Sequence, residues 1–233
     1  MDIHRPKPWH GLREFLKEYG IIVLGVLTAI GLEQMVEQLH WRHVVHQHRE
    51  ALDSSVSDLY LAMLSRADMQ DCVDRRLGDI ATILARHDAG QPLSVVGPLG
   101  TPTASVADLG VFDMSLADQA FSHMPFEEQT GYFSKLGSYK VFVQVMTSER
   151  EVWRELGRLN HARALTAEDW SVVRANYEQA ADLNALLKTD LTTQGSGTWL
   201  TPFKDTPKPK DYSLRALPRV KTLCSPMLGG AGR

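Results

Sequence analysis

The chain has 233 residues, which is enough to bury a sizeable core in one or two domains. Its apolar fraction of 43% and charged fraction of 23% are ordinary for a folded protein and argue against wholesale disorder. The formal net charge is −3, and Lys and Arg are scattered singly, so no basic stripe indicates a nucleic-acid partner.

An apolar run without charges lies near the N-terminus. Residues 20–32 read GIIVLGVLTAIGL, thirteen positions that span about 20 Å as a helix, less than the roughly 30 Å of a hydrocarbon core. Extending the run to residues 15–36 gives 22 residues and about 33 Å, which is long enough. The longer segment includes four charged or polar residues, Lys17, Glu18, Glu33 and Gln34. The sequence predicts a permanent transmembrane anchor with residues 19–36 as its span.

Three alternatives compete with this anchor. The small-x-small triplet at residues 29–31 is typical of signal-peptide cleavage, although the helical pattern continues beyond it. Apolar runs of this length are often helices buried in a soluble core. A helix lying flat on the membrane would use an apolar side made of Trp9, Leu12, Phe15, Leu16 and Tyr19.

The charges that flank the run predict its orientation. Four basic residues precede it, and fewer follow before residue 50; the four are Arg5, Lys7, Arg13 and Lys17. Because cytoplasmic flanks carry the excess of Lys and Arg, we expect a cytoplasmic N-terminus and a periplasmic body at a bacterial inner membrane. The expected divisions are a cytoplasmic lead-in at 1–18, the anchor at 19–36, a periplasmic helical domain at 37–194 and an extended strap at 195–233.

Most of the body has helical periodicity. Residues 33–88 contain no proline and one glycine, and their apolar residues recur on one side, so they form one long helix or two broken near residues 65–68. Residues 89–107 are rich in Gly, Pro, Ser and Thr, which predicts a loop. Residues 126–161 predict the clearest helix of the body, with one apolar face that extends over about seven turns from Tyr132 to Leu156.

Two capping boxes are expected in the body. Ser115 with Asp118 predicts the start of a short helix, and Thr166 with Asp169 predicts the start of another. The inner face expected for the second of these helices consists of Trp170, Val173, Tyr177, Ala180, Asn184 and Leu187. From Gly195 onwards five prolines exclude long helices, so this tail should be extended. The fold class predicted is all-α: a transmembrane helix, an antiparallel bundle of about four helices and a Pro-rich strap.

The chain has two cysteines, Cys72 and Cys224, and neither has a partner at the spacing of a zinc site. If the body lies outside the cytoplasm, a disulfide between them is the economical interpretation, and it would pin the tail across the helices. The alternative is two unrelated buried thiols.

Four histidines follow the apolar run in LHWRHVVHQHRE. His40, His43 and His46 recur every three residues, and imidazoles at this spacing can bind a divalent metal or haem, or titrate together near neutral pH. The sequence lacks the HExxH motif, and a polar helix next to the membrane explains the same pattern without a ligand.

Glu33 and a set of small residues indicate a protein partner in the membrane. Glu33 lies about 10 Å from the midpoint near Val26, just inside the hydrocarbon edge, where an acidic group favours a partner on a neighbouring span. Alternatively, the Glu33 side chain reaches the membrane–water interface and needs no protein partner. The small residues that permit close helix approach are Gly20, Gly25, Thr28 and Gly31.

Enzyme motifs are missing from the sequence. There is no GxSxG elbow, P-loop or GxGxxG after a strand. We expect Glu149 and Glu151 to be solvated, and Arg75 and Arg76 to face solvent or an acidic helix. The chain is therefore expected not to be an enzyme and to use no cofactor.

Three patches resemble one loose set of uncharacterised proteobacterial single-pass inner-membrane proteins. They are REFLKEYGIIVLGVLTAIGLEQ at 13–34, CVDRRLGDI at 72–80 and CSPML at 224–228. This resemblance implies an N-terminal anchor and supports the disulfide between the two distant cysteines, but it transfers no activity.

Together these features predict a non-catalytic accessory or scaffold subunit. It would contact membrane lipid and other inner-membrane subunits, and no nucleic acid. The alternatives are a sensor-like ligand-binding module, because helical bundles hold ligands between their helices, and a metal- or haem-binding protein that uses the histidines.

Overall fold

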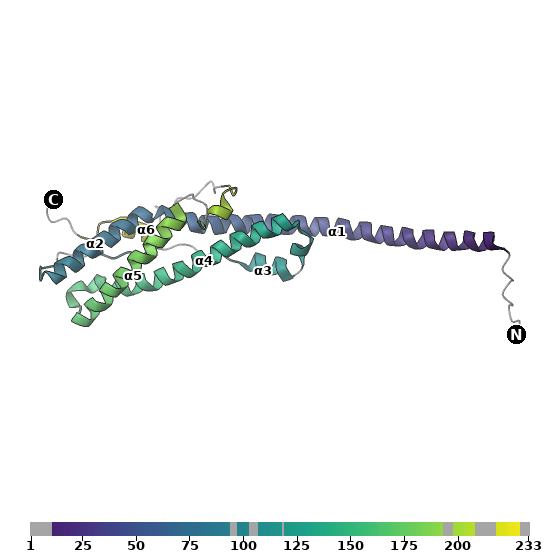
Figure 1. Ribbon diagram of the computed structural model, residues 1–233. Coiled ribbons are helices and arrows are strands. Elements are labelled where there is room, and N and C mark those ends of the chain that lie inside the picture. Colours follow the sequence, from purple (N-terminus) through teal and green to yellow (C-terminus); the bar gives the residue numbers. More distant parts are fainter. Residues whose placement is uncertain are drawn as a thin grey trace.

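The computed structural model describes residues 11–93, 97–102, 107–117, 119–192, 198–207 and 218–228. Over these residues the regular structure is helical and no strand is present, which confirms the all-α prediction. Figure 1 shows an elongated helical body from which the N-terminal part of one long helix projects.

The projecting helix is α1, Leu12–Asp68, whose 57 residues extend over about 85 Å. The second helix, α2, Gln70–Asp88, follows after Met69 alone. Met69 keeps right-handed helical angles, and its N–H is bonded to the carbonyl of Arg66 at 3.2 Å, one residue closer than in a regular α-helix. Residues 33–88 thus form two helices joined by one tightened turn, so α2 continues the course of α1 (Figure 1).

A hairpin of α4, Phe126–Leu156, and α5, Ala167–Thr192, packs against α1 and α2, with the 3-10 segment η2, Gly157–Ala164, between its arms. The side-chain pairs Arg49–Glu128 and Arg66–Glu149 advance together along the chain, so α4 runs parallel to α1. Helix α5 returns antiparallel to both. The parallel pair arises because α2 ends at Asp88, whereas α4 begins at Phe126, next to Arg49 on α1.

The apolar core is divided into two clusters along the body. The first cluster joins α1 to α4 and includes Leu52, Leu59 and Tyr139. The second joins α2 to the end of α4 and the start of α5, and includes Ile80 and Trp153. The inner faces predicted for α4 and α5 are confirmed, since their apolar members are buried or half-buried.

A buried polar layer separates the two clusters. The Arg66 guanidinium donates to both carboxylate oxygens of Glu149, at 3.0 and 2.7 Å, and neither side chain is exposed to solvent. The same guanidinium donates to the side-chain oxygens of Gln70 and Asn184. The prediction that Glu149 is solvated is wrong, because a carboxylate at this position is the partner that a buried arginine requires.

The layer continues to the surface through Asp74. Its carboxylate accepts hydrogen bonds from Gln70 and Asn184, at 2.9 and 2.7 Å, and from the ammonium of Lys188 at 2.8 Å. Partial burial opposes ionisation of Asp74, but these donors outweigh it, so the pKa of Asp74 lies below its usual value. Every partner in this layer comes from α1, α2, α4 or α5, so the layer fixes the register of all four helices.

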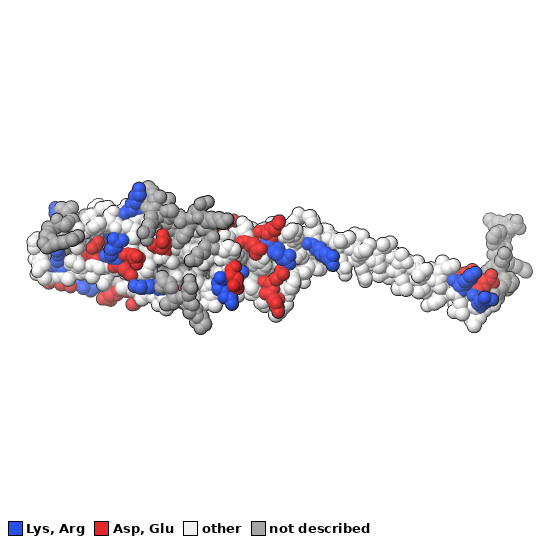
Figure 2. Space-filling model, turned by 90° about the horizontal axis from the view of Figure 1, so that it is seen from above, with Lys and Arg blue, Asp and Glu red and all other residues white. Residues whose placement is uncertain are grey.

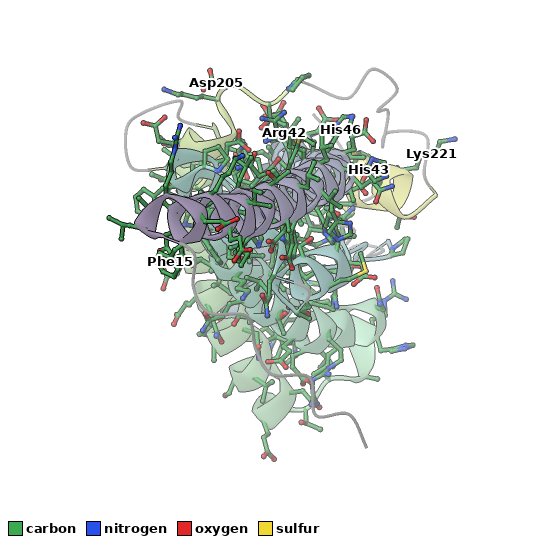
Figure 3. The ribbon with its side chains drawn as sticks, turned by 90° about the vertical axis from the view of Figure 1, so that its right-hand side faces the viewer. Phe15, Arg42, His43, His46, Asp205 and Lys221 are labelled. Atoms are coloured by element: carbon green, nitrogen blue, oxygen red, sulfur yellow. A yellow bond between two sulfur atoms is a disulfide. The ribbon has the colours of Figure 1, made fainter. Side chains whose placement is uncertain are left out.

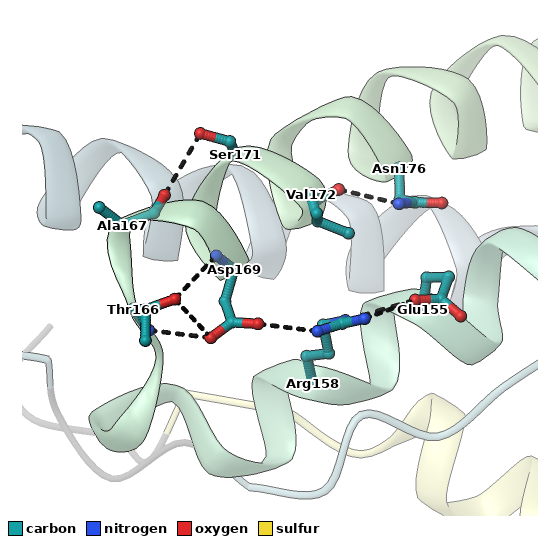
Figure 4. Close-up of polar contacts among 8 residues, drawn as sticks. All are labelled: Glu155, Arg158, Thr166, Ala167, Asp169, Ser171, Val172 and Asn176. Carbon is teal, nitrogen blue, oxygen red and sulfur yellow. Dashed lines mark hydrogen bonds and ion pairs between the residues drawn. The ribbon is translucent and has the colours of Figure 1, made fainter.

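The capping box at Thr166 is confirmed and begins α5. The backbone N–H and hydroxyl of Thr166 donate to Asp169, whose own N–H is bonded to the Thr166 hydroxyl (Figure 4). These bonds from Thr166 hold the pKa of Asp169 below its usual value. The Arg158 guanidinium donates hydrogen bonds to the carboxylates of both Asp169 and Glu155.

The capping box predicted at Ser115 is wrong. Helix α3, Gly110–Ala117, begins five residues earlier, where the Asp108 carboxylate accepts the N–H of Gly110 at 2.9 Å. Ser115 is buried inside the helix, and its hydroxyl is 2.8 Å from Nδ1 of His48 on α1. Asp118 lies outside the described residues.

The C-terminal strap is partly helical, contrary to the prediction that it is extended. It contains the 3-10 turn η3, Thr201–Phe203, and the short helix α6, Pro218–Cys224, which packs against α2. Pro218 is tolerated because it occupies the first turn of α6, where its missing N–H needs no partner.

The strap is held on α2 by a disulfide and by a buried arginine. Cys72 and Cys224 are bridged, with Cα atoms 4.7 Å apart, which confirms the predicted pairing. Arg76 donates to the carbonyls of Pro98, Thr222, Leu223 and Ser225 at 2.7 to 3.1 Å. Arg76 is 1% exposed, so the prediction that it faces solvent or an acidic helix is wrong.

Gly100 permits the close approach of the strap to the preceding loop. It has a positive φ of 63°, and a Cβ at this position would lie 2.6 Å from the backbone nitrogen of Leu223.

We predict that Glu149→Gln lowers the free energy of unfolding by about 3–5 kcal/mol, because it leaves the Arg66 charge buried without its counter-ion. The matched control, Glu151→Gln, changes an exposed carboxylate two residues away and should have an effect within about 0.5 kcal/mol. The joint replacement Arg66→Met with Glu149→Leu should cost less than Glu149→Gln alone. Urea unfolding of the full chain in detergent measures all three, and equal stability of the two glutamine variants would contradict the prediction.

We also predict that the disulfide stabilises the folded chain. In the chain-entropy model, closing a loop with a sequence separation of 152 residues contributes about 4–5 kcal/mol. The double variant Cys72→Ser with Cys224→Ser should therefore unfold at lower urea than the oxidised wild type, and reductant should bring the wild type to the level of the variant. Thiols that react with maleimide before reduction would show that the bridge does not form.

Candidate functional site

The first candidate surface is the projecting segment of α1. None of residues 11–40 is buried, and the exposed apolar side chains are Leu12, Phe15, Leu16, Tyr19, Ile21, Ile22, Leu24, Val26, Leu27, Ile30, Leu32, Met35, Val36 and Leu39. Figure 2 shows a stretch of this segment without Lys, Arg, Asp or Glu, between charges at the tip and at the base. Among the described residues, α1 is the one helix long and apolar enough to cross a membrane.

This exposure excludes one of the alternatives. A helix that packs in the soluble core of its own chain would have its apolar side chains buried, but no residue of the candidate span is buried here. The core-helix interpretation is therefore wrong. A continuous helix also passes through the triplet at residues 29–31 and into the body.

The small residues of the span are open to an approaching helix. A Cβ built on Gly20, Gly25 or Gly31 would have no neighbouring atom within 4 Å, and the Thr28 hydroxyl donates to the carbonyl of Leu24 at 2.7 Å. At 100° per residue, Gly20, Thr28 and Gly31 lie within about 80° of one another. Glu33 is exposed on another side, and among the described residues no hydrogen bond or ion pair involves its side chain.

The predicted histidine set does not converge on one point. His43 and His46 lie on the upper side of α1 in Figure 3, and each contacts its own helix, His43 with Gln47 at 3.1 Å and His46 with Glu50 at 3.7 Å. His40 lies edge-on to Trp41, with ring centroids 5.6 Å apart. Across the part of the chain that the structure describes, no three His, Cys, Asp or Glu side chains are placed to hold a metal ion.

The second candidate surface is a groove where α1 enters the body. Its volume is about 660 Å³, and it is lined by Gln34, Glu37, Gln38, Trp41, Arg42, Val45, Arg49, His123 and Pro125. The 3-10 turn η1, Ala120–His123, forms one wall, and its His123 ring stacks on Trp41 with centroids 3.6 Å apart and planes 16° apart.

The body side of this groove is held by polar contacts between α1 and α4. Arg49 donates twice to one carboxylate oxygen of Glu128, at 3.1 and 2.8 Å. One turn further along, the Tyr132 hydroxyl donates to Asp53 at 2.7 Å. Burial, and then the Asp53 carboxylate, raise the pKa of Tyr132, so this phenol remains a donor throughout the physiological range.

No local sequence pattern indicates the groove as a whole. Trp41 is recognisable as an aromatic residue just beyond the apolar run, but nothing local indicates that His123 stacks on it across 81 intervening positions. Comparisons of the chain with protein-family models, curated proteins and solved structures find no match. The resemblance to single-pass inner-membrane proteins therefore stays a prediction.

Proposed function

We propose that this protein is a non-catalytic accessory subunit, anchored in a bacterial inner membrane by the projecting part of α1, which presents its helical body to other membrane subunits on the periplasmic side. The observation that carries the proposal is the continuity of α1. One helix includes both the exposed apolar segment and the α1 residues of the first core cluster, so it holds the body at a fixed distance from whatever surrounds the segment.

Energetics favour lipid as the environment of the projecting segment. An apolar helix pays a cost in water roughly proportional to its exposed apolar area, and no apolar side chain from Leu12 to Leu39 is buried. The helix satisfies its backbone hydrogen bonds internally, as a membrane span requires.

The orientation rests on charge and on the disulfide. Arg13 and Lys17 lie at the tip of α1, on the side expected to face the cytoplasm. A bridge between Cys72 and Cys224 suits an oxidising compartment such as the periplasm.

The proposal of a protein partner rests on further exposed apolar side chains, at the end of the body nearest the projecting segment. Met114, Leu116, Phe126 and Phe133, on α3 and α4, are between 44% and 77% exposed. Aromatic and methionine side chains at a surface are typical of protein interfaces. The alternative of a histidine-based metal or haem protein is less favoured, because the three histidines contact their own helix separately.

We predict that Leu24→Lys with Leu27→Lys releases the protein from the membrane, because each lysine near the centre of a span costs about 3 kcal/mol. The control is Leu186→Lys, an exposed leucine on α5. After carbonate extraction, wild type and control should sediment with membranes, and the double variant should remain soluble. A wild type that stays in the supernatant after lysis without detergent would overturn the anchor.

We predict that these exposed apolar side chains of α3 and α4 contact another subunit. A photo-crosslinking amino acid at Phe126 or Phe133 should give a discrete adduct in native membranes, and the same residue at Leu186 should not. Purification from these membranes in mild detergent should yield a complex larger than the monomer. Monomer alone, with no adduct at any of the three positions, would contradict the accessory role.

A further inference from the structure

We propose that the bridge between Cys72 and Cys224 is a thiol–disulfide exchange site for small thiols that carry a carboxylate. The thiol enters a pocket that opens on the bridge and forms a mixed disulfide with Cys224. The inference does not depend on the membrane anchor, because the pocket is formed by α2 and the strap, within the body.

The bridge lines an open pocket at the surface of the body. The pocket has a volume of about 470 Å³, which lies in the range of sites for small organic ligands. Its lining residues are Asp71, Cys72, Arg75, Lys221, Cys224 and Ser225. Cys72 is 7% exposed whereas Cys224 is half-buried, so a nucleophile from solvent has better access to Cys224.

A guanidinium is held beside the less accessible sulfur. Arg75 Nε donates to the backbone carbonyl of Asp71 at 3.2 Å, and Nη2 of the same guanidinium lies 3.4 Å from Sγ of Cys72. When a thiolate attacks Cys224, the S–S bond breaks and Cys72 leaves with the negative charge. A positive charge at this distance stabilises the departing thiolate, and a more stable leaving thiolate makes exchange faster.

The exchange step balances with the thiol as the one co-reactant. The incoming thiolate forms a bond with Sγ of Cys224, and the electron pair of the broken S–S bond goes to Sγ of Cys72. Arg76 binds backbone carbonyls on both sides of Cys224, so the two cysteines stay close after the bridge opens. Attack of the Cys72 thiolate on the mixed disulfide then reverses the step and releases the small thiolate.

The charges around the pocket favour an anionic thiol. Lys221 lies three residues before Cys224 on α6 and extends to the surface (Figure 3), and Arg75 supplies a second positive charge. Asp71 supplies one negative charge, so the three side chains together leave one positive charge at the pocket. A carboxylate on the thiol is therefore attracted, and an ammonium is repelled.

The test measures opening of the bridge in the full-length oxidised protein in detergent, with three thiols of similar size and different charge. They are mercaptopropionate, mercaptoethanol and cysteamine, which carry a carboxylate, a hydroxyl and an ammonium. Each reaction is quenched with iodoacetamide and followed by mass spectrometry. Each rate is divided by the rate of the same thiol with the urea-unfolded chain, because this ratio removes differences in intrinsic reactivity.

We expect the ratio for mercaptopropionate to exceed that for mercaptoethanol about fivefold, the effect of one unit charge about 4 Å away in water. The ratio for cysteamine should be the lowest. In about 1 M salt, where the Debye length is about 3 Å, the three ratios should converge. Peptide mapping should find the small thiol on Cys224 and the iodoacetamide label on Cys72.

Substitutions of the flanking charges should change this preference in opposite directions. Arg75→Gln and Lys221→Gln should each lower the preference for mercaptopropionate about fivefold, and Asp71→Asn should raise it by a similar factor. Arg75→Gln should also slow opening by uncharged mercaptoethanol, because it removes the charge beside the leaving thiolate. All three residues are exposed, so these variants should fold. The matched controls Arg150→Gln and Lys140→Gln, at exposed positions of α4, should keep the wild-type preference.

Three results would overturn the exchange site while leaving the anchor intact. They are a folded bridge that none of the thiols opens at concentrations that open it in the unfolded chain, equal ratios for the three thiols, and a preference unchanged by Arg75→Gln and Lys221→Gln. Recovery of the small thiol on Cys72 would overturn the assignment of Cys224 as the attacked residue. Loss of the preference in Arg150→Gln or Lys140→Gln would show that the pocket is not its source.

Discussion

The rest of the structure depends on the continuity of α1. A helix with no proline and no break between Leu12 and Asp68 cannot let the apolar segment and the body adopt independent orientations. The body is therefore built on the last part of the same helix whose first part is exposed and apolar. If a bilayer surrounds the apolar segment, the distance of Trp41 and of the groove from the hydrocarbon core follows from their positions along α1.

A second constraint fixes the other helices on α1. The Arg66–Glu149 pair and its amide partners lie between two apolar clusters, where a shift of α4 or α5 by one turn would separate the charges. We infer that this layer sets helix register, because any shift that separates the pair would leave two charges buried without partners. At the end of the body away from the projecting segment, the disulfide joins the strap covalently to α2. Hydrogen bonds from Arg76 to four backbone carbonyls add to this attachment of α6.

The sequence predicted features that depend on local periodicity. The apolar faces of α4 and α5, the capping box at Thr166 and the length of the apolar run all follow from residues within a few turns of one another. The disulfide was predictable from its expected compartment, not from spacing. The histidines kept the predicted helical spacing, but a shared stripe on one helix does not bring imidazoles to a common point without ligands from another helix.

Most of the failures involve contacts between distant segments. Glu149 and Arg76 look like surface charges because nothing nearby in the chain indicates the guanidinium or the carbonyls that satisfy them. Ser115 and its partner three residues later match a capping box, but Asp108 begins the helix earlier, and His48 contacts the serine instead. The parallel course of α4 was missed because an antiparallel neighbour is the usual result of a short connection, and residues 89–125 are a long one.

The central claim is that α1 crosses a membrane with the body on the outer side. The direct measurement is the labelling of single introduced cysteines by a membrane-impermeant maleimide in intact spheroplasts. Ser54→Cys lies on the exposed side of α1 within the body, and Arg13→Cys lies at the N-terminal tip of α1. We expect Ser54→Cys to react in intact spheroplasts and Arg13→Cys to react only after permeabilisation. Reaction of both before permeabilisation, or of Arg13→Cys alone, would contradict it.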